Sequence, residues 1–275
     1  MRLTLLGTGT SFGVPQVGCT CSVCTSTDPR DRRTRAGAVI EAAGRRLLVD
    51  TPPELRLQLV AAGIDRVDAV LFTHAHADHV HGIDDLRAIP SGRREGSDGG
   101  GAAPGRRDAG GLPAYGPAHT LTELARRFSY IFDSSLIPVP GTSKPQLRPE
   151  PLEPGQVVEI AGIAVLPLGL PHGGQQVFGY RFGPIAYLTD AKEVPEPVRE
   201  RLAGLEVLVL NALLERPHPL HLSIPEAVAT AQAIGARRTL LTHLTHASHH
   251  RDLAARLPSG IEPGYDGLVI EVAEA

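Results

Sequence analysis

The chain has 275 residues, of which 42% are hydrophobic, so it is long enough to form one large domain with an extensive core. Its formal net charge of −3 and its lack of an extended basic stripe argue against a general nucleic-acid binder and favour a small substrate. No apolar run is long enough to cross a membrane, and Met1 leads directly into a strand-like segment, which predicts a cytoplasmic protein.

Apolar segments alternate with turn residues along the chain, without an internal repeat, and predict a single domain over residues 1–275. Strands are predicted near Arg2–Leu6, Ala38–Glu41, Leu47–Asp50, Ala69–Thr73, Val157–Leu166, Phe178–Phe182, Ile185–Thr189, Val207–Leu210, Thr239–Thr242 and Leu268–Val272. Helices are predicted at Pro53–Ala62, His79–Ile89, Pro117–Phe132, Pro195–Ala203 and Ser223–Ile234. Residues 91–111 are rich in glycine and arginine and predict a flexible insertion, either inert or in contact with a substrate phosphate.

Two polar segments near the N-terminus invite functional interpretations that their context does not support. The Gly7–Thr10 loop lacks the lysine of a P-loop and the third glycine of a dinucleotide-binding fingerprint. Its glycines are expected instead to allow a close approach of backbone at the end of the first strand. The Arg30–Arg33 run is expected to be a solvated surface turn, with attraction of phosphate as the alternative.

All three cysteines lie in one C-x-C-x-x-C cluster, at Cys19, Cys21 and Cys24. A secreted disulfide framework would have an even number of cysteines spread along the sequence, so reduced thiols are favoured. Three thiolates on one loop predict a structural zinc ion whose tetrahedral site is completed by a histidine. His246 is the favoured fourth ligand, and His249 and His250 are the alternatives.

The densest group of potential metal ligands directly follows the predicted strand Ala69–Thr73. Four ligands occur within six residues, at His74, His76, Asp78 and His79. Imidazole and carboxylate suit zinc, manganese or iron, and side chains two residues apart converge on an ion only where the backbone forms an irregular loop. The segment therefore predicts a catalytic metal site on a loop after a buried strand.

Three further apolar segments each run into one potential ligand, at His172, Asp190 and His243. A single aspartate or histidine in such a place more often caps a loop, but three of them beside the first group indicate that strand ends converge on one centre. Asp50 closes another apolar strand, and it is either a supporting acid or simply the start of the next loop.

The segment from His74 to His79 resembles the H-x-H-x-D-H signature of the metallo-β-lactamase superfamily, and the three strand-end ligands follow in that superfamily's order. The resemblance implies an α/β (α+β) fold, the four-layer αββα sandwich. It also implies two divalent ions, zinc or manganese, that share a bridging hydroxide. One ion would be bound by His74, His76 and His172, and the other by Asp78, His79 and His243, with Asp190 bridging them. Asp50 would orient a ligand histidine.

The opening Leu6–Pro15 segment, the cysteine loop and the closing Gly264–Gly267 segment narrow the resemblance. Over nearly the whole chain they are similar to the phosphoribosyl 1,2-cyclic phosphate phosphodiesterases of the phosphonate-degradation (carbon–phosphorus lyase) pathway. That family implies hydrolysis of a small cyclic phosphodiester by the metal-bridged hydroxide, with Asp78 and His221 in the catalytic machinery. His221 would protonate the leaving alkoxide, and His218 is an alternative donor.

Three other functions stay open: an RNA-processing nuclease, a thioester or lactam hydrolase, and a non-catalytic, zinc-dependent protein of cofactor biosynthesis. The nuclease would need more basic surface, and the complete ligand set from His74 to His243 argues against the non-catalytic alternative. The favoured function requires two catalytic divalent ions, one structural zinc ion and a small phosphodiester substrate. The family resemblance also leaves a homodimer open.

Overall fold

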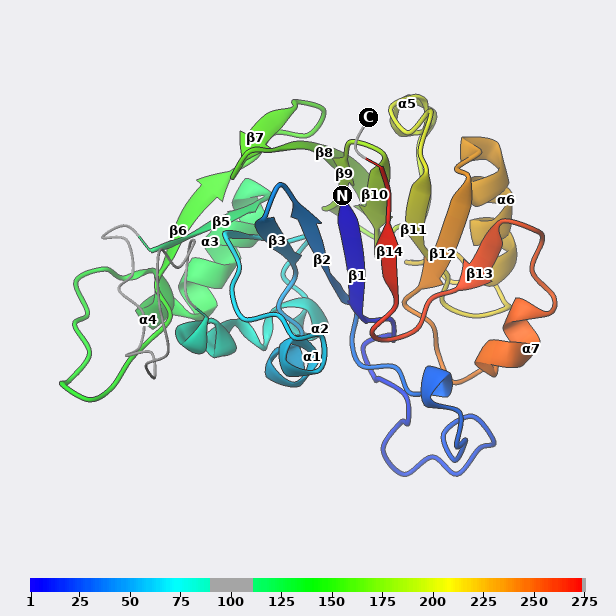
Figure 1. Ribbon diagram of the computed structural model, residues 1–275, viewed down its shortest axis with the longest axis horizontal. Coiled ribbons are helices and arrows are strands. Elements are labelled where there is room, and N and C mark those ends of the chain that lie inside the picture. The colour runs from blue at the N-terminus through cyan, green and yellow to red at the C-terminus, as the bar shows by residue number, and fades with distance from the viewer. Residues whose placement is uncertain (90–110, 274–275) are drawn as a thin grey trace.

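The computed structural model describes residues 1–89 and 111–273, and in this part of the chain two seven-stranded β-sheets form the centre of the molecule (Figure 1). The strand order is β14-β1-β2-β3-β4-β5-β6 in the first sheet and β13-β12-β11-β10-β9-β8-β7 in the second. The first sheet comprises β1 (Arg2–Gly7), β2 (Gly37–Ala42), β3 (Arg45–Val49), β4 (Ala69–Leu71), β5 (Leu112–Gly116), β6 (Leu147–Pro151) and β14 (Val269–Glu271). The second comprises β7 (Val158–Ile160), β8 (Ile163–His172), β9 (Gln175–Phe182), β10 (Ile185–Leu188), β11 (Val207–Asn211), β12 (Arg238–Thr242) and β13 (Ile261–Pro263).

Both sheets follow the same plan, with antiparallel strands on one side and parallel strands on the other. In the first sheet the pairs from β14 to β3 are antiparallel and those from β3 to β6 are parallel. In the second sheet the pairs from β7 to β10 are antiparallel and those from β10 to β13 are parallel. Because parallel strands have their carboxyl ends at the same edge of a sheet, residues that follow β3, β4, β10 and β12 gather there.

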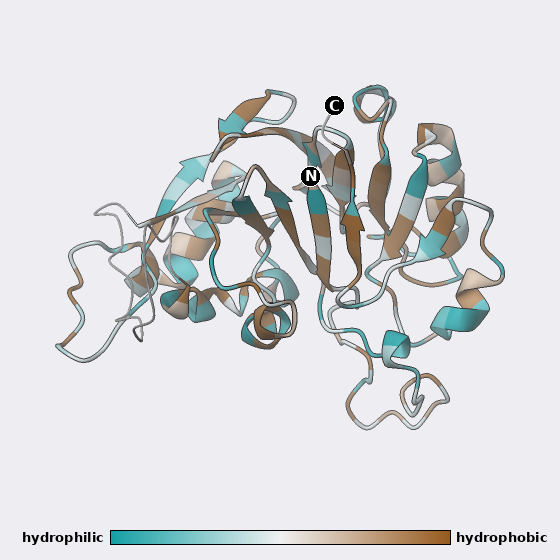
Figure 2. Ribbon diagram, in the orientation of Figure 1, coloured by the Kyte–Doolittle hydropathy of each residue, from teal (hydrophilic) through white to brown (hydrophobic). Residues whose placement is uncertain are grey.

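The two sheets enclose a core of apolar side chains that come from alternate positions of the strands. Leu3 and Ile40 of the first sheet belong to the same buried cluster as Tyr180 and Val209 of the second, and all four are fully buried. Hydrophobic residues accordingly dominate the strands in Figure 2, whereas hydrophilic residues are concentrated on the helices and loops. Burial of this surface is the main contribution that holds the two sheets together.

Helices cover the outer face of each sheet. The helical segments are α1 (Leu55–Ala61), α2 (Ala77–Val80), α3 (Ala118–Arg127), α4 (Ser129–Phe132), α5 (Glu196–Glu200), α6 (Ile224–Ile234) and α7 (His250–Ala254), with 3₁₀ turns η1 (Pro29–Asp31) and η2 (Ile83–Ala88). Leu55 of α1 and Leu121 of α3 pack with Leu48 of the first sheet, and Ala227 of α6 packs with Leu208 of the second. The layers therefore run helix, sheet, sheet, helix, which confirms the predicted four-layer αββα sandwich.

Several predicted elements have different bounds in the structure. The strand predicted at Val157–Leu166 is two strands, because Ala161 and Gly162 form a turn with φ of 51° and 81°. The helix predicted at His79–Ile89 is replaced by the single turn α2 and the 3₁₀ segment η2, and the one at Pro117–Phe132 is divided at Phe128. Three short strands, β5, β6 and β13, and helix α7 were not predicted.

The prediction of one domain over residues 1–275 stays a prediction, and the flexible insertion predicted at 91–111 lies almost wholly outside the described residues. Among the helices that the structure describes, none combines the length and the apolar character needed to cross a bilayer.

Candidate metal centre

Ligand residues converge at the carboxyl ends of the parallel strands, and several of them have a strained backbone. Asp50 follows β3, Asp190 follows β10 and His243 follows β12, and their φ angles are 62°, 58° and 59°. Non-glycine residues rarely adopt this left-handed conformation, which is retained where the surrounding structure enforces it, often at functional sites. Each turn away from the strand end thus directs a carboxylate or an imidazole toward the same place.

The structure brings together all seven residues predicted to bind the catalytic metal ions. We call them the strand-end cluster: His74, His76, Asp78, His79, His172, Asp190 and His243. One group of mutually close ligand atoms comes from His74, His76 and His172, another from Asp78, His79 and His243, and a third from His74, His79 and Asp190. Within each group the atoms lie within 4.8 Å of one another. Asp190 therefore lies between the two predicted metal positions.

Hydrogen bonds behind the cluster fix the orientation of two of its histidines. Asp50 is fully buried, and its Oδ2 accepts a hydrogen bond from His79 Nδ1 at 2.7 Å. The same carboxylate accepts from the backbone N–H and from the hydroxyl of Thr73, each at 2.8 Å. Because the Thr73 hydroxyl donates to Asp50, its oxygen accepts from His74 Nδ1 at 2.9 Å. Both imidazoles therefore direct Nε2 into the cluster, because Asp50 and Thr73 engage their Nδ1 atoms, as is usual for histidines that bind metal ions.

Two further ligands, His172 and Asp190, are also held by hydrogen bonds. His172 Nδ1 donates to the carbonyl oxygen of Leu220 at 3.0 Å, which leaves its Nε2 for the cluster. Asp190 Oδ2 accepts from the Thr189 hydroxyl at 2.6 Å. His243 Nε2 lies 3.3 Å from Asp190 Oδ1 and 3.6 Å from Asp78 Oδ2.

Burial and mutual charge interactions shift the pKa values of these groups. Burial is the largest cause of the lowered pKa of His74 and of His76. Burial alone would raise the pKa of Asp190, but the neighbouring His243 and His79 outweigh it and hold that pKa well below its usual range. Burial would likewise lower the pKa of His79, yet the surrounding carboxylates raise it well above the ordinary value. The carboxylates therefore favour positive charge at the centre of the cluster.

The donor set fits divalent metal ions. The Nε2 atoms of His74, His79 and His243 are buried and have no hydrogen-bond partner among the described residues. A buried polar atom without a partner is costly in a folded protein unless another group binds it. Imidazole nitrogens and carboxylate oxygens are ligands that zinc and manganese accept. Ions bound here would remove that cost and balance the carboxylate charge.

His221 lies beside the cluster, as predicted for a residue that acts on the substrate. Its Nδ1 is 3.6 Å from Asp190 Oδ1, and its ring centroid is 4.8 Å from those of both His172 and His243. Burial, followed by the charge of His243, lowers the pKa of His221 to about 3. The alternative donor His218 lies farther out, with its ring centroid 5.2 Å from that of His221. The Ser223 capping box at the start of α6 fixes the chain just after His221.

The second set of predicted ligands forms a separate group, which we call the thiol cluster: Cys19, Cys21, Cys24 and His246. The three sulfur atoms lie 3.3, 3.5 and 3.3 Å from His246 Nδ1. Zinc binds sulfur at about 2.3 Å and nitrogen at about 2.0–2.1 Å, so one ion can reach all four atoms. A hydrogen bond from the backbone of Cys24 lowers the pKa of Cys21 to about 6, whereas burial raises that of Cys24 to about 11.

Some residues that support the site were not predicted from the sequence. Thr73 links Asp50 to His74, and Asn211 at the end of β11 bonds both the N–H and the carbonyl of Ala191, at 2.9 and 3.1 Å. Asn211 thereby fixes the chain directly after Asp190. Threonine and asparagine have structural roles in every protein. Only their positions near strand ends could have predicted that these two residues support the site.

The αββα sandwich, with imidazole and carboxylate ligands at the ends of its strands, defines a metal-dependent hydrolase of the metallo-β-lactamase type. A family model described as a beta-lactamase superfamily domain matches residues 45–244. The chain belongs to this superfamily, whose fold implies the binding of divalent metal ions such as zinc.

Individual proteins with known structures or names show more specific similarities to this chain. The crystal structure of a diphosphatase from the PhnP family is similar over 99% of this chain and 98% of that one, with 36% identity and a TM-score of 0.85. An octanoyltransferase of Porphyromonas gingivalis is 40% identical over 271 residues, which cover 98% of this chain and 51% of that protein. A ribonuclease Z of a Bradyrhizobium species is 29% identical over 181 residues, which cover 65% of this chain and 52% of that protein.

The chain spans about half the length of these two curated relatives, 51% and 52% respectively. The likeness to the diphosphatase, by contrast, covers nearly the whole of both chains. The protein is thus a member of the metallo-β-lactamase superfamily that is similar to a PhnP-family diphosphatase over nearly its whole length and to ribonuclease Z over part of it.

Proposed function

We propose that the protein is a metal-dependent phosphodiesterase that hydrolyses a small cyclic phosphodiester, such as phosphoribosyl 1,2-cyclic phosphate. The observation that carries the proposal is the position of Asp190 between two groups of ligand atoms, with His221 beside it. The likeness to a PhnP-family diphosphatase supports hydrolysis at phosphorus. Two nearby divalent ions bound by such a cluster could together activate a water molecule and stabilise the charge on a phosphoryl group, which favours hydrolysis.

His74, His76 and His172 would hold one divalent ion, zinc or manganese, and Asp78, His79 and His243 the second, with Asp190 shared between them. Bound ions supply a water of lowered pKa and stabilise negative charge on the phosphoryl oxygens. Asp50 and Thr73 keep the ligand histidines in the tautomer that directs Nε2 to the ions. In this proposal the thiol cluster holds a third, structural zinc ion.

His221 is proposed to protonate the alkoxide that leaves phosphorus. An alkoxide is a poor leaving group, and a positioned imidazole typically accelerates such a step by about 10²- to 10⁴-fold. In the protein alone its pKa is lowered to about 3 by burial and by His243. The negative charge of a bound phosphodiester acts in the opposite direction and favours the protonated imidazole.

A second candidate function is RNA cleavage, which the ribonuclease Z relatives favour. Metal ions held by the same ligands can also act on a linear phosphodiester. The two candidate functions therefore differ in which substrate the protein surface accepts. The name of the Porphyromonas relative suggests octanoyl chemistry, although this chain matches only 51% of that protein. We therefore treat thioester hydrolysis as a further alternative.

A hydrolysis panel tests these proposals against one another. Purified, metal-replete protein is offered phosphoribosyl 1,2-cyclic phosphate, a 2′,3′-cyclic nucleotide, a linear diester, an octanoyl thioester and a precursor transfer RNA. The proposal predicts turnover of a cyclic phosphodiester and loss of that turnover in the Asp190→Asn variant. Cleavage of the RNA without action on small cyclic esters would establish the second function instead. Inactivity on all five substrates would leave the non-catalytic zinc-dependent function as the better explanation.

A further inference from the structure

Two of the four residues predicted to form a solvated surface turn, Asp31 and Arg33, are buried, whereas Arg30 and Arg32 are exposed. Asp31 is 2% exposed and Arg33 is 1% exposed. The backbone of Arg33 pairs with Val14 in both directions, each bond at 2.8 Å, which carries this segment under the loop of the thiol cluster. The predicted surface turn is confirmed for Arg30 and Arg32 and wrong for Asp31 and Arg33. Asp31 is buried because it bonds to residues more than 200 positions away, which the sequence does not show.

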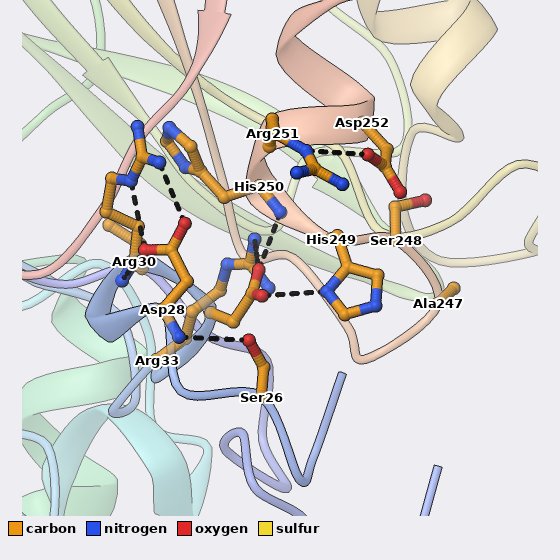
Figure 3. A network of polar contacts seen from close by, with 12 residues as sticks. Ser26, Asp28, Arg30, Arg33, Ala247, Ser248, His249, His250, Arg251 and Asp252 are labelled. Atoms are coloured by element: carbon orange, nitrogen blue, oxygen red, sulfur yellow. Dashed lines mark hydrogen bonds and ion pairs between the residues drawn. The ribbon is translucent and has the colours of Figure 1, made fainter. Parts of the chain in front are cut away.

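A chain of hydrogen bonds leads from Asp31 to the cysteine loop. Asp31 Oδ1 accepts from the backbone N–H of His250 at 2.6 Å, and Oδ2 accepts from His249 Nδ1 at 2.8 Å. His249 Nε2 lies 3.1 Å from the hydroxyl of Ser22, between Cys21 and Cys24. Figure 3 shows His249 and His250 at this network, three and four residues after His246. The two predicted alternative zinc ligands therefore contact Asp31.

The chemistry of the groups sets the direction of these bonds. A carboxylate accepts hydrogen bonds only, so His249 Nδ1 carries a proton. Nε2 of the neutral imidazole is then an acceptor, and the Ser22 hydroxyl donates to it. One carboxylate thus holds the chain on the far side of His246 and, through His249, the loop that carries the three thiols.

We propose that Asp31 and His249 are positioning residues that hold the cysteine loop against His246, so that the four ligand atoms are gathered before zinc binds. This inference rests on the proposed zinc site of the thiol cluster. Without these bonds a flexible loop would have to be ordered when the ion binds, so that three sulfur atoms come within 3.5 Å of His246 Nδ1. Hydrogen bonds that do not involve the ion supply this order in advance. Hydrogen bonds made directly to metal ligands are typically worth about 10- to 100-fold in metal affinity, and the lower end of that range is expected for bonds that hold the ligand-bearing segments.

Two substitutions remove the link without touching a ligand. Ser22→Ala deletes only the hydroxyl that meets His249, and His249→Phe keeps the ring while removing both nitrogens. Asp31→Ala is less suitable, because Asp31 is also the carboxylate nearest to the buried Arg33, at 3.9 Å, and its loss would disturb the fold. Ser248→Ala is the matched control, because its hydroxyl accepts from Arg256 at 3.4 Å and lies next to His249 in the chain.

The test is a cobalt(II) titration of the purified full chain, followed by the thiolate-to-cobalt charge-transfer absorption, which reports the thiol cluster and not the strand-end cluster. We expect the affinity for cobalt to fall about 10-fold or more in Ser22→Ala and in His249→Phe, and to be unchanged in Ser248→Ala. Circular dichroism establishes that each variant is folded.

Equal cobalt affinities in the wild type and in both link variants would overturn the inference. An equal loss in Ser248→Ala would also overturn it, because the effect would then be general to the segment. Absence of the thiolate band in the wild type would refute the zinc site itself, and the inference with it. The hydrolysis panel is independent of this readout, so failure of the phosphodiesterase proposal would be recognised separately.

Discussion

The strand-end cluster and the thiol cluster are assembled in opposite ways. The first draws its ligands from strand ends in both sheets, and five of its seven members are buried, the exceptions being His76 and Asp78. The second takes three ligands from one loop, and of its four members Cys24 alone is buried. The strand-end cluster is thus positioned by the whole sandwich, whereas the thiol cluster depends on local hydrogen bonds. The first cluster is therefore part of the sandwich itself, whereas the second joins the cysteine loop to the segment around His246.

The largest expected effect is a loss of turnover when His221, beside the strand-end cluster, is replaced. His221→Ala should lower turnover of a cyclic phosphodiester by roughly 10²- to 10⁴-fold while the metal content is unchanged, because the residue is proposed to donate a proton and to bind no ion. Steady-state kinetics with metal analysis measures both. His218→Ala is the matched control and should stay close to the wild-type rate. A reversed pattern would make His218 the donor.

A smaller effect is expected when the support of the strand-end cluster is altered. Asp50→Asn leaves one oxygen for three donors and places an amide N–H against His79 Nδ1, so metal affinity should fall about 10- to 100-fold. Competition with a chelator measures the affinity. Asp68→Asn, which alters a carboxylate at the opposite end of β4, should leave it unchanged. An unaltered affinity in Asp50→Asn would show that the sandwich does not need this bond.

The smallest effect on activity is expected at the thiol cluster. Cys21→Ser should remove one metal ion per chain and lower the melting temperature, by about 2–4 °C for each kcal/mol of stability lost, while hydrolysis persists. Thr25→Ala, in the same loop, is the control, because its hydroxyl donates to the carbonyl of Cys21 and not to a thiol. Abolished hydrolysis in folded Cys21→Ser protein would contradict the division of roles between the two clusters.

Much of this comparison could be predicted from the sequence, because ligand types at the ends of apolar segments are easy to recognise. The proximity of His74, His172, Asp190 and His243 follows from that pattern together with the fold. The link from Asp31 through His249 to Ser22 could not be predicted from the sequence. Asp31 and His249 are 218 positions apart in the chain. The arginines on either side of Asp31 predicted a solvated turn instead.

The fold was predicted at the level of layers and less well at the level of elements. The strands β5, β6 and β13 were missed because they are short and each contains proline, which disfavours a strand assignment. The helix predicted from His79 is one turn long, because the backbone carbonyls of His79 and Val80 accept hydrogen bonds from Thr51. Local patterns do not show such tertiary constraints.

We propose that the strand-end cluster binds two ions and the thiol cluster one. The most direct measurement is the metal content of metal-replete wild-type protein by mass spectrometry, with protein concentration from amino-acid analysis. We predict about three ions per chain, of which about two remain in Cys21→Ser. A single ion in the wild-type chain would contradict the two-ion centre and the hydrolytic function built on it.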